Sequence, residues 1–314
     1  MTTLVTGANG FVGSALCARL SRDGAALRRA VRSLNSQPEG VEAIAMGSLS
    51  SETDWTVALR SVDQVVHLAA RVHVMNDKSG DPLAEFRRVN VDGTANLARQ
   101  SAAAGVRRFV YLSSIKVNGE FTQEGHPFTA DDAPAPEDPY AVSKHEAEQA
   151  LRQIAAKTGM EVVIIRPPLV YGPGVKANFE SMMRWLSRGV PLPLAAANRN
   201  RRSLVALDNL VDLILTCLQH PKAANQTFLV TDGEDLSTTE LLQRMGQAID
   251  RPTCLLPVPV SLLAFAARLL GKKAVAQRLL GSLQVDISKT CELLDWKPPV
   301  TVDEGLRRAA KQRL

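Results

Sequence analysis

Short apolar runs alternate along the first 170 residues with longer stretches in which apolar residues recur at helical spacing. A helix is predicted over residues 11–22, where Leu16 and Leu20 share one face, and further helices are predicted over 82–104 and 140–156. The runs that predict strands are residues 4–6, 26–31, 42–46, 64–68, 107–112 and 161–166. This alternation is typical of a parallel sheet with helices on both faces. We therefore predict an α/β fold with a doubly wound parallel sheet.

The first predicted strand ends in a glycine-rich turn. A dinucleotide pyrophosphate needs such a turn, because the backbone must approach the phosphates and a helix N-terminus must face their charge. Glycine turns also begin ordinary helices, so the pattern alone leaves both interpretations open. The turn residues predicted to bind a cofactor are Gly7, Gly10, Phe11, Val12 and Gly13.

The residues after the second and fourth predicted strands extend this cofactor hypothesis. Arg32 and Ser33 stand where dinucleotide folds often carry a carboxylate that binds the adenosine ribose. An arginine there can instead pair with a 2′-phosphate, which favours NADP(H) and leaves NAD(H) as the other possibility; a plain surface arginine is the alternative. After the fourth strand, small side chains leave room for ribose and phosphates, and the residues concerned are Leu68, Ala69 and Ala70.

The regular alternation of strand and helix is lost beyond Gly172-Pro173-Gly174. With 314 residues the chain is long enough for a large core and a smaller lobe. We predict an NADP-binding domain of the Rossmann type over residues 1–170. Residues 171–314 are predicted to form mainly a substrate-binding lobe, with segments that return to the first sheet.

Three polar residues form a candidate catalytic group. Ser114 follows the fifth predicted strand, at the sheet edge where open α/β sheets bind ligands. Tyr140 and Lys144 are four residues apart on a helix and therefore share a face. The lysine is expected to lower the pKa of the Tyr140 phenol from its reference value of about 10. Ser114 can then hold a carbonyl or alcohol oxygen while Tyr140 moves its proton and a nicotinamide exchanges the hydride.

These motifs together resemble the extended short-chain dehydrogenase/reductases, the NAD-dependent epimerase/dehydratase family, which act largely on nucleotide sugars. The resemblance rests on residues 6–13, 67–70, 90–94, 113–114, 140–144 and 166–174. It implies catalytic roles for Ser114, Tyr140 and Lys144. It also implies that Asn90 and Pro167 lie beside the cofactor. Candidate substrate-binding residues on the same basis are Ser114, Lys116, Asn178, Arg202 and Arg278.

Two positions differ from the patterns of particular enzymes in this family, and the differences reduce the number of reactions that we expect. Sugar 4,6-dehydratases of this family carry an acidic pair where this chain has Ile115-Lys116, so dehydration is disfavoured. UDP-sugar 4-epimerases usually have an acidic residue at the position of Arg32, which favours net reduction by NADPH.

The C-terminal segment over residues 262–283 resembles bacterial reductases of UDP-4-keto-6-deoxy-N-acetylhexosamines. We therefore predict reduction of the C4 ketone of a UDP-2-acetamido-2,6-dideoxy-hexos-4-ulose. The product would be UDP-N-acetylquinovosamine or UDP-N-acetylfucosamine, used in O-antigen synthesis. The alternatives are an NAD-dependent UDP-hexose 4-epimerase, acting on UDP-GlcNAc or UDP-glucose, and a non-catalytic NADP-binding protein.

The amino-acid composition limits the classes of partner and cofactor that we expect. Apolar residues make up 45% and charged residues 22% of the chain, as in ordinary soluble proteins. Aromatic residues make up 4%, and 37 basic against 32 acidic residues are spread along the chain, which does not favour a nucleic-acid partner. The four cysteines and five histidines show no ligand spacing, so no metal is expected. The start Met1-Thr2-Thr3 lacks the features of a signal peptide, which predicts a cytoplasmic protein.

The apolar run over residues 262–270 is too short to span a membrane. With Lys272 and Lys273 beside it, the run could lie on a membrane surface, but packing in the core is the expected outcome. The family resemblance also implies a homodimer formed through the helices over 82–104 and 140–156.

Overall fold

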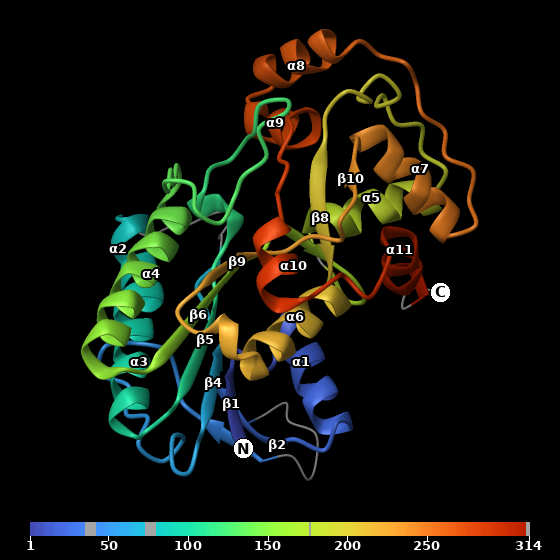
Figure 1. Cartoon of the computed structure of the whole chain (residues 1–314). Helices are drawn as coiled ribbons and strands as arrows, with labels where there is room; N and C mark the ends of the chain where they lie inside the picture. The colour runs from blue at the N-terminus through green and yellow to red at the C-terminus, as the bar shows by residue number, and fades with distance from the viewer. Residues whose placement is uncertain (35–41, 73–79, 176, 312–314) are drawn as a thin grey trace.

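The computed structural model describes residues 1–34, 42–72, 80–175 and 177–311, apart from the side chains of residues 177, 178, 273 and 274. Its central feature is a seven-stranded sheet with the strand order β3-β2-β1-β4-β5-β6-β9, in which all the described pairings are parallel (Figure 1). The strands are β1 (Thr2–Thr6), β2 (Ala26–Val31), β3 (Ala43–Ala45), β4 (Gln64–His67), β5 (Arg108–Leu112), β6 (Glu161–Arg166) and β9 (Thr227–Leu229).

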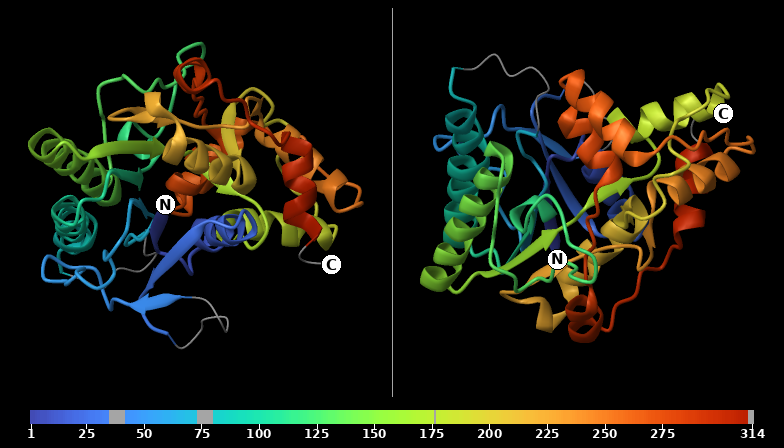
Figure 2. Two further views of the ribbon diagram at one scale, coloured as in Figure 1. Left: turned by 60° about the horizontal axis from the view of Figure 1, so that its bottom comes forward. Right: turned by 90° about the horizontal axis from the view of Figure 1, so that it is seen from above.

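Helices cover both faces of this sheet, because successive strand residues point to opposite sides and both sets are apolar. Val5 and Val66 pack with α1 (Phe11–Arg22), α6 (Leu207–Gln219) and α10 (Ser288–Leu294), whereas Leu4 and Val65 pack with α3 (Gly93–Ala103) and α4 (Pro139–Thr158). Figures 1 and 2 show these helices on opposite sides of the strands. The predicted doubly wound α/β fold is confirmed.

The predicted helix over residues 82–104 is divided into three parts. It begins as α2 (Pro82–Phe86), continues as the π-helical segment η1 (Arg87–Asp92) and ends as α3. Asp81 caps its start, since its carboxylate accepts a hydrogen bond from the Ala84 amide. A π-helical turn widens the helix locally and is frequent at functional sites. Asn90 lies within this segment, with 1% of its surface exposed.

A second, smaller sheet with the order β10-β8-β7 forms above the first one. Its apolar core contains Phe179, Met182, Leu204, Leu241 and Leu306. Strand β9 follows β7 and β8 in the sequence, but it pairs with β6 of the central sheet. The remaining elements are β7 (Leu169–Tyr171), β8 (Arg202–Ala206), β10 (Asp235–Leu236), α5 (Ala177–Ser187), α7 (Thr238–Ala248), α8 (Val260–Leu269), α9 (Lys273–Leu280) and α11 (Val302–Lys311).

The expectation that residues 262–270 pack in the core is wrong. All ten residues of α8 are described, and each is exposed or half-buried. Helix α8 is exposed because it lies at the far end of the molecule from the central sheet, against α9 (Figure 1). Within the described part of the chain, none of the helices has the length and hydropathy needed to cross a bilayer.

Candidate active site

The glycine turn after β1 packs directly against the segment after β4, where the strand order of the central sheet reverses. Gly7 has a φ of +67°, and a Cβ there would lie 2.8 Å from the Ala69 nitrogen. A Cβ on Gly13 would lie 2.1 Å from the Gly7 carbonyl oxygen. Only glycines allow the turn to pack this closely against residues 68–70. The turn and the N-terminus of α1 therefore fit the pyrophosphate of a dinucleotide.

A buried hydrogen-bond chain joins the end of β1 to the end of β4 and the residues after it. Thr6 Oγ1 accepts hydrogen bonds from the Leu68 and Ala69 amides, each at 3.2 Å, and lies 2.6 Å from Nδ1 of His67. The Thr6 hydroxyl proton is therefore donated to Nδ1, and Nε2–H of His67 donates to Thr94 Oγ1 at 2.9 Å. Burial lowers the pKa of His67 to about 3, so the ring is neutral. His67 was not among the residues predicted from the sequence to contribute to the site.

Two arginines lie in and just after β2, and one of them, Arg29, is not among the residues predicted from the sequence. Arg32 and Ser33, the predicted residues, follow β2 and are exposed. Arg29 is 8% exposed, and its guanidinium lies 3.4 Å from Asn9 Oδ1 in the glycine turn. The Arg29 Nε has no hydrogen-bond partner among the described atoms. A buried cation next to the turn would add to its attraction for phosphate.

Asn90 links the helix η1 to two neighbouring segments. Its Oδ1 accepts a hydrogen bond from the Arg71 amide at 2.8 Å. Its Nδ2 donates to the Arg71 carbonyl and to Ser143 Oγ, both at 3.0 Å. Ser143 immediately precedes Lys144 in α4. Asn90 thus connects the segment after β4 to the helix that carries the candidate catalytic pair.

The candidate catalytic residues come together at the carboxyl end of β5. Asp138 caps α4 by accepting a hydrogen bond from the Ala141 amide at 2.7 Å, and Pro139 occupies the first turn. This places Tyr140 at the beginning of α4, where it hydrogen-bonds Ser114. Lys144 is buried, and its Nζ donates to the Leu112 carbonyl at 2.8 Å. Its Nζ lies 6.0 Å from the centre of the Tyr140 ring.

The electrostatics of this group differ from the expectation that Lys144 lowers the pKa of Tyr140. Burial and the nearby Asp138 carboxylate raise the pKa of Tyr140 to about 12, although the hydrogen bond with Ser114 opposes this change. Burial lowers the pKa of Lys144 to about 7, and the Glu148 carboxylate opposes that change. Near neutral pH Lys144 is therefore protonated in only part of the molecules, and its Nζ points to the Leu112 carbonyl. In this state the phenol is a proton donor.

A buried ion pair lies directly behind these residues. Arg166, at the end of β6, donates two hydrogen bonds to the Glu148 carboxylate, from Nε at 2.9 Å and from Nη2 at 2.5 Å. Ser113 Oγ donates to the same carboxylate at 2.5 Å. Because Ser113 precedes Ser114 and Glu148 follows Lys144 by one turn, the pair fixes the strand end relative to α4.

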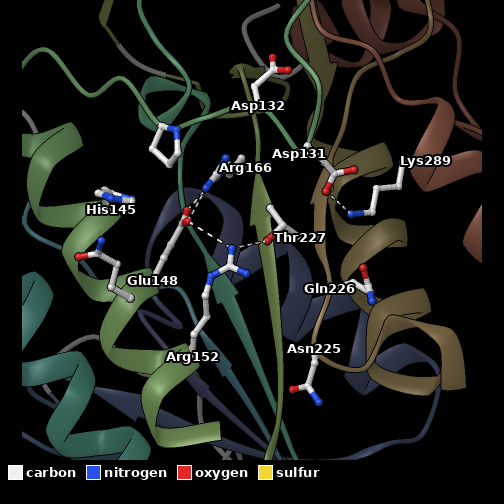
Figure 3. Close-up of a pocket in the computed structure, with 13 residues that line it drawn as sticks. Asp131, Asp132, His145, Glu148, Arg152, Arg166, Asn225, Gln226, Thr227 and Lys289 are labelled. Carbon is white, nitrogen blue, oxygen red and sulfur yellow. Dashed lines mark hydrogen bonds and ion pairs between the residues drawn. The ribbon is translucent and has the colours of Figure 1, made fainter. Parts of the chain in front are cut away.

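A cavity of about 350 Å³ opens on the far side of this ion pair. Figure 3 shows Glu148 between Arg166 and Arg152, and Arg152 also donates to Thr227 Oγ1 at 2.8 Å. Lys289 and Asp131, which form an ion pair at 2.7 Å, close the opposite wall. Cations and carboxylates alternate around the cavity, so its charge is balanced.

The candidate substrate residues occupy several places. Lys116 forms ion pairs with Glu120 at 2.6 Å and with Asp138 at 2.5 Å, next to Tyr140. Arg202 begins β8 and donates to the Gly281 carbonyl at 3.2 Å. Burial and the nearby Arg278 of α9 lower the pKa of Arg202, so these two cations are neighbours. Pro167 follows β6, and its carbonyl accepts a hydrogen bond from the Ile115 amide at 3.0 Å. The side chain of Asn178 lies outside the described residues.

The fold and this arrangement define a dinucleotide-dependent enzyme of the Rossmann type. Residues 3–230 match the NAD dependent epimerase/dehydratase family, and the chain belongs to that family. A UDP-glucose 4-epimerase of Vibrio cholerae is 50% identical over 309 residues, which are 98% of this chain and 94% of the relative.

Two more distant proteins have related names. An N-acetyl-alpha-D-glucosaminyl-diphospho-ditrans,octacis-undecaprenol 4-epimerase of Escherichia coli O157:H7 is 27% identical over 97% of this chain and 93% of its own length. The crystal structure of a UDP-N-acetylglucosamine 4-epimerase from Bacillus cereus superimposes with a TM-score of 0.83, at 22% identity, over 100% of both chains. This structural likeness shows the shared fold.

The predicted 4-ketoreductase function is contradicted by the similarity to the Vibrio cholerae epimerase at 50% identity. The physical reason is that the roles expected of Ser114, Tyr140 and Lys144 are the same in a 4-ketoreductase and in a 4-epimerase. The glycine turn and the candidate catalytic residues do not determine whether the hydride comes from an external reductant or from the same sugar. Arg32 was expected to select the dinucleotide, and that expectation says nothing about the type of reaction.

Proposed function

We propose that this protein is a UDP-sugar 4-epimerase that uses NAD. The observation that carries the proposal is the 50% identity, over 98% of the chain, to a UDP-glucose 4-epimerase. The assembled Ser114, Tyr140 and Lys144 at the carboxyl edge of the sheet support it. A UDP-hexose with a free hydroxyl at C4 is the proposed substrate.

The proposed mechanism assigns one proton-transfer path to the chain. Bound NAD supplies a reversible hydride acceptor for C4 of the sugar. Ser114 hydrogen-bonds the oxygen on C4. Tyr140, in the ionised form that a charged Lys144 favours, takes the proton from that oxygen as the alcohol becomes a ketone. Tyr140 returns the proton when C4 is reduced on its other face, so no net oxidation occurs. Lys144 favours the phenolate when it is charged, and Arg202 is proposed to bind the diphosphate.

The reaction can be tested with purified protein and UDP-glucose, without added cofactor. Chromatography should show conversion to UDP-galactose and no net formation of NADH. Tyr140→Phe should keep the fold and the bound nucleotide but lose turnover by at least about 100-fold, since general acid–base catalysis contributes that much. Full turnover by this variant, or no interconversion by nucleotide-loaded wild type, would contradict the proposal.

The identity of the dinucleotide is a separate prediction. We propose NAD because the matched family is described as NAD dependent, while Arg32 remains the reason to expect NADP. Denaturing the purified protein should release NAD, and Arg32→Asp should leave that nucleotide bound. The NAD proposal fails if the protein instead releases NADP and the Arg32→Asp variant no longer binds it. That result would mean that Arg32 pairs with the 2′-phosphate of NADP.

A lipid-linked sugar diphosphate is a second candidate substrate. The Escherichia coli relative is named for such a substrate. The structural observation that favours it is the position of Arg202, whose neighbour Arg278 lies on α9, directly beside the exposed helix α8. Interconversion of the undecaprenyl-linked sugar, with no reaction on UDP-sugars, would favour this candidate over the first.

A further inference from the structure

Large apolar side chains are exposed on the two short helices α8 and α9 and the segment before them. Phe265 is 59% exposed, Leu269 72% and Leu270 71%. Leu262, Phe265 and Leu269 share one face of α8, because residues three and four apart are neighbours on a helix. We call this the α8–α9 surface, and its exposed apolar residues are Leu256, Val260, Leu262, Phe265, Leu269, Leu270 and Val275.

Such a concentration is unusual for a surface exposed to water. Half of the 14 exposed large apolar side chains in the described part of the chain belong to the α8–α9 surface. Isolated exposed apolar residues need no explanation, but a contiguous group of them marks an interaction site. Figure 1 shows α8 at the outer edge of the molecule, with α9 as its neighbour.

The charged residues of the same segment are all basic. Residues 251–285 contain no aspartate or glutamate, and their basic residues are Arg251, Arg268, Lys272, Lys273 and Arg278. The chain has a formal net charge of +5, so this segment accounts for the whole excess and the rest of the chain is balanced. Arg268 and Lys272 are exposed beside the apolar face of α8.

We propose that the α8–α9 surface docks on an anionic lipid bilayer. Interfacial helices combine bulky apolar residues with lysine and arginine, burying the former at the headgroup boundary and pairing the latter with acidic lipids. A second copy of the chain fits less well. Two-fold interfaces place the same patch on both sides, which would set the cations of one segment against those of the other without any acidic residue between them.

Docking of the α8–α9 surface would hold the proposed substrate-binding lobe close to the membrane. Arg278 belongs to α9 and neighbours Arg202, the proposed diphosphate ligand. The surface thus adjoins the substrate lobe, on the opposite side from the N-terminal end of β1 (Figure 1). The inference goes beyond the proposed function and does not depend on which sugar reacts.

The experiment is co-sedimentation of the full chain with vesicles. Wild type should pellet with phosphatidylcholine vesicles that contain about 30% phosphatidylglycerol, and little should pellet with phosphatidylcholine alone. Two double variants, Phe265→Ser with Leu269→Ser and Arg268→Glu with Lys272→Glu, should each reduce the bound fraction by about 10-fold or more.

Matched controls keep the result interpretable. Val57 is 60% exposed on another part of the surface, and Lys157 and Lys222 are exposed cations elsewhere. Val57→Ser and the double variant Lys157→Glu with Lys222→Glu should bind vesicles as wild type does. All variants should keep the wild-type circular dichroism and the wild-type rate on a soluble UDP-sugar.

Two outcomes would overturn the proposal. One is equal binding of wild type and both α8 variants to acidic vesicles. The other is sedimentation equilibrium showing a dimer that Phe265→Ser with Leu269→Ser dissociates, which would assign the surface to a second copy. Loss of epimerase activity in every variant would concern the proposed function, whereas vesicle binding is read without any turnover.

Discussion

At the scale of single residues, the Glu148 carboxylate shows how position decides the strength of an ion pair. Two arginines approach it. The Arg166 side chain is 3% exposed and lies 2.5 Å away, whereas the Arg152 side chain is 51% exposed and lies 3.8 Å away. Removing the partner of a buried charge leaves that charge uncompensated, while an exposed pair exchanges its partner for water.

Arg166→Met should therefore lower the free energy of unfolding by about 3–5 kcal/mol. Arg152→Met is the matched control and should cost less than about 1 kcal/mol. Urea denaturation followed by circular dichroism measures both values. Equal costs for the two variants would mean that the ion pair behind the catalytic residues is not the stabilising contact that its burial indicates.

The residues of the candidate site differ in how far the sequence could predict them. Gly7, Ser114, Tyr140 and Lys144 belong to local motifs, so their types and spacing are visible in the chain. The chain of Thr6, His67 and Thr94 joins residues from three elements, and only the folded sheet brings them together. The raised pKa of Tyr140 has the same origin, since it depends on burial and on the nearby Asp138 carboxylate.

At the scale of elements, the strands and helices around the central sheet could be predicted well. Helix α1 and strands β2 and β6 have the predicted bounds, because their apolar spacing is regular. Gly24 follows α1 and precedes β2, and Pro167 follows β6. Helix α8 could not be placed in the same way. Its apolar residues surround the helix except on the side of Ser261 and Arg268, so the pattern does not distinguish burial in a core from exposure at an interface.

The start of α1 offers a test at this scale. Gly13 lies within the helix, where alanine has the better intrinsic propensity, yet a Cβ there would lie 2.1 Å from the Gly7 carbonyl oxygen. Gly13→Ala should therefore displace the turn and weaken dinucleotide binding by about 10-fold or more, equivalent to about 1.4 kcal/mol.

Calorimetric titration of nucleotide-free protein measures this change. Gly80→Ala is the control, because a Cβ at Gly80 meets no atom of the described residues within 4 Å. If Gly13→Ala binds the dinucleotide as tightly as Gly80→Ala does, the close contact between the glycines is not what shapes the site.

At the scale of the whole molecule, burial controls the ionisation of all three tyrosines. It raises the pKa values of Tyr111 and Tyr171 as well as that of Tyr140, and carboxylates near each add to the effect. The chain has 3 tyrosines in total. The folded protein should thus show no tyrosinate absorbance at pH of about 10, where half of the phenols of an unfolded chain are ionised.

The same shifts predict how stability depends on alkaline pH. Above a pH of about 10 the unfolded chain loses phenolic protons that the folded chain retains. The free energy of unfolding should therefore be unaffected by the tyrosines below this pH and should fall as the pH rises above it. A spectrophotometric titration with and without guanidinium chloride measures both effects. Tyrosinate absorbance in the folded protein at the usual pKa would contradict the burial of the three rings.

The late return of β9 to the central sheet has a consequence for synthesis of the protein. Strand β6 is complete at Arg166, but its partner β9 spans Thr227–Leu229. While the ribosome makes the intervening segment, the backbone of residues 164–166 is an open parallel edge flanked by buried apolar side chains. Unpaired edges recruit strands from other chains. Truncated products that end before residue 227 should therefore aggregate, and translation through β9 is the step that closes the sheet.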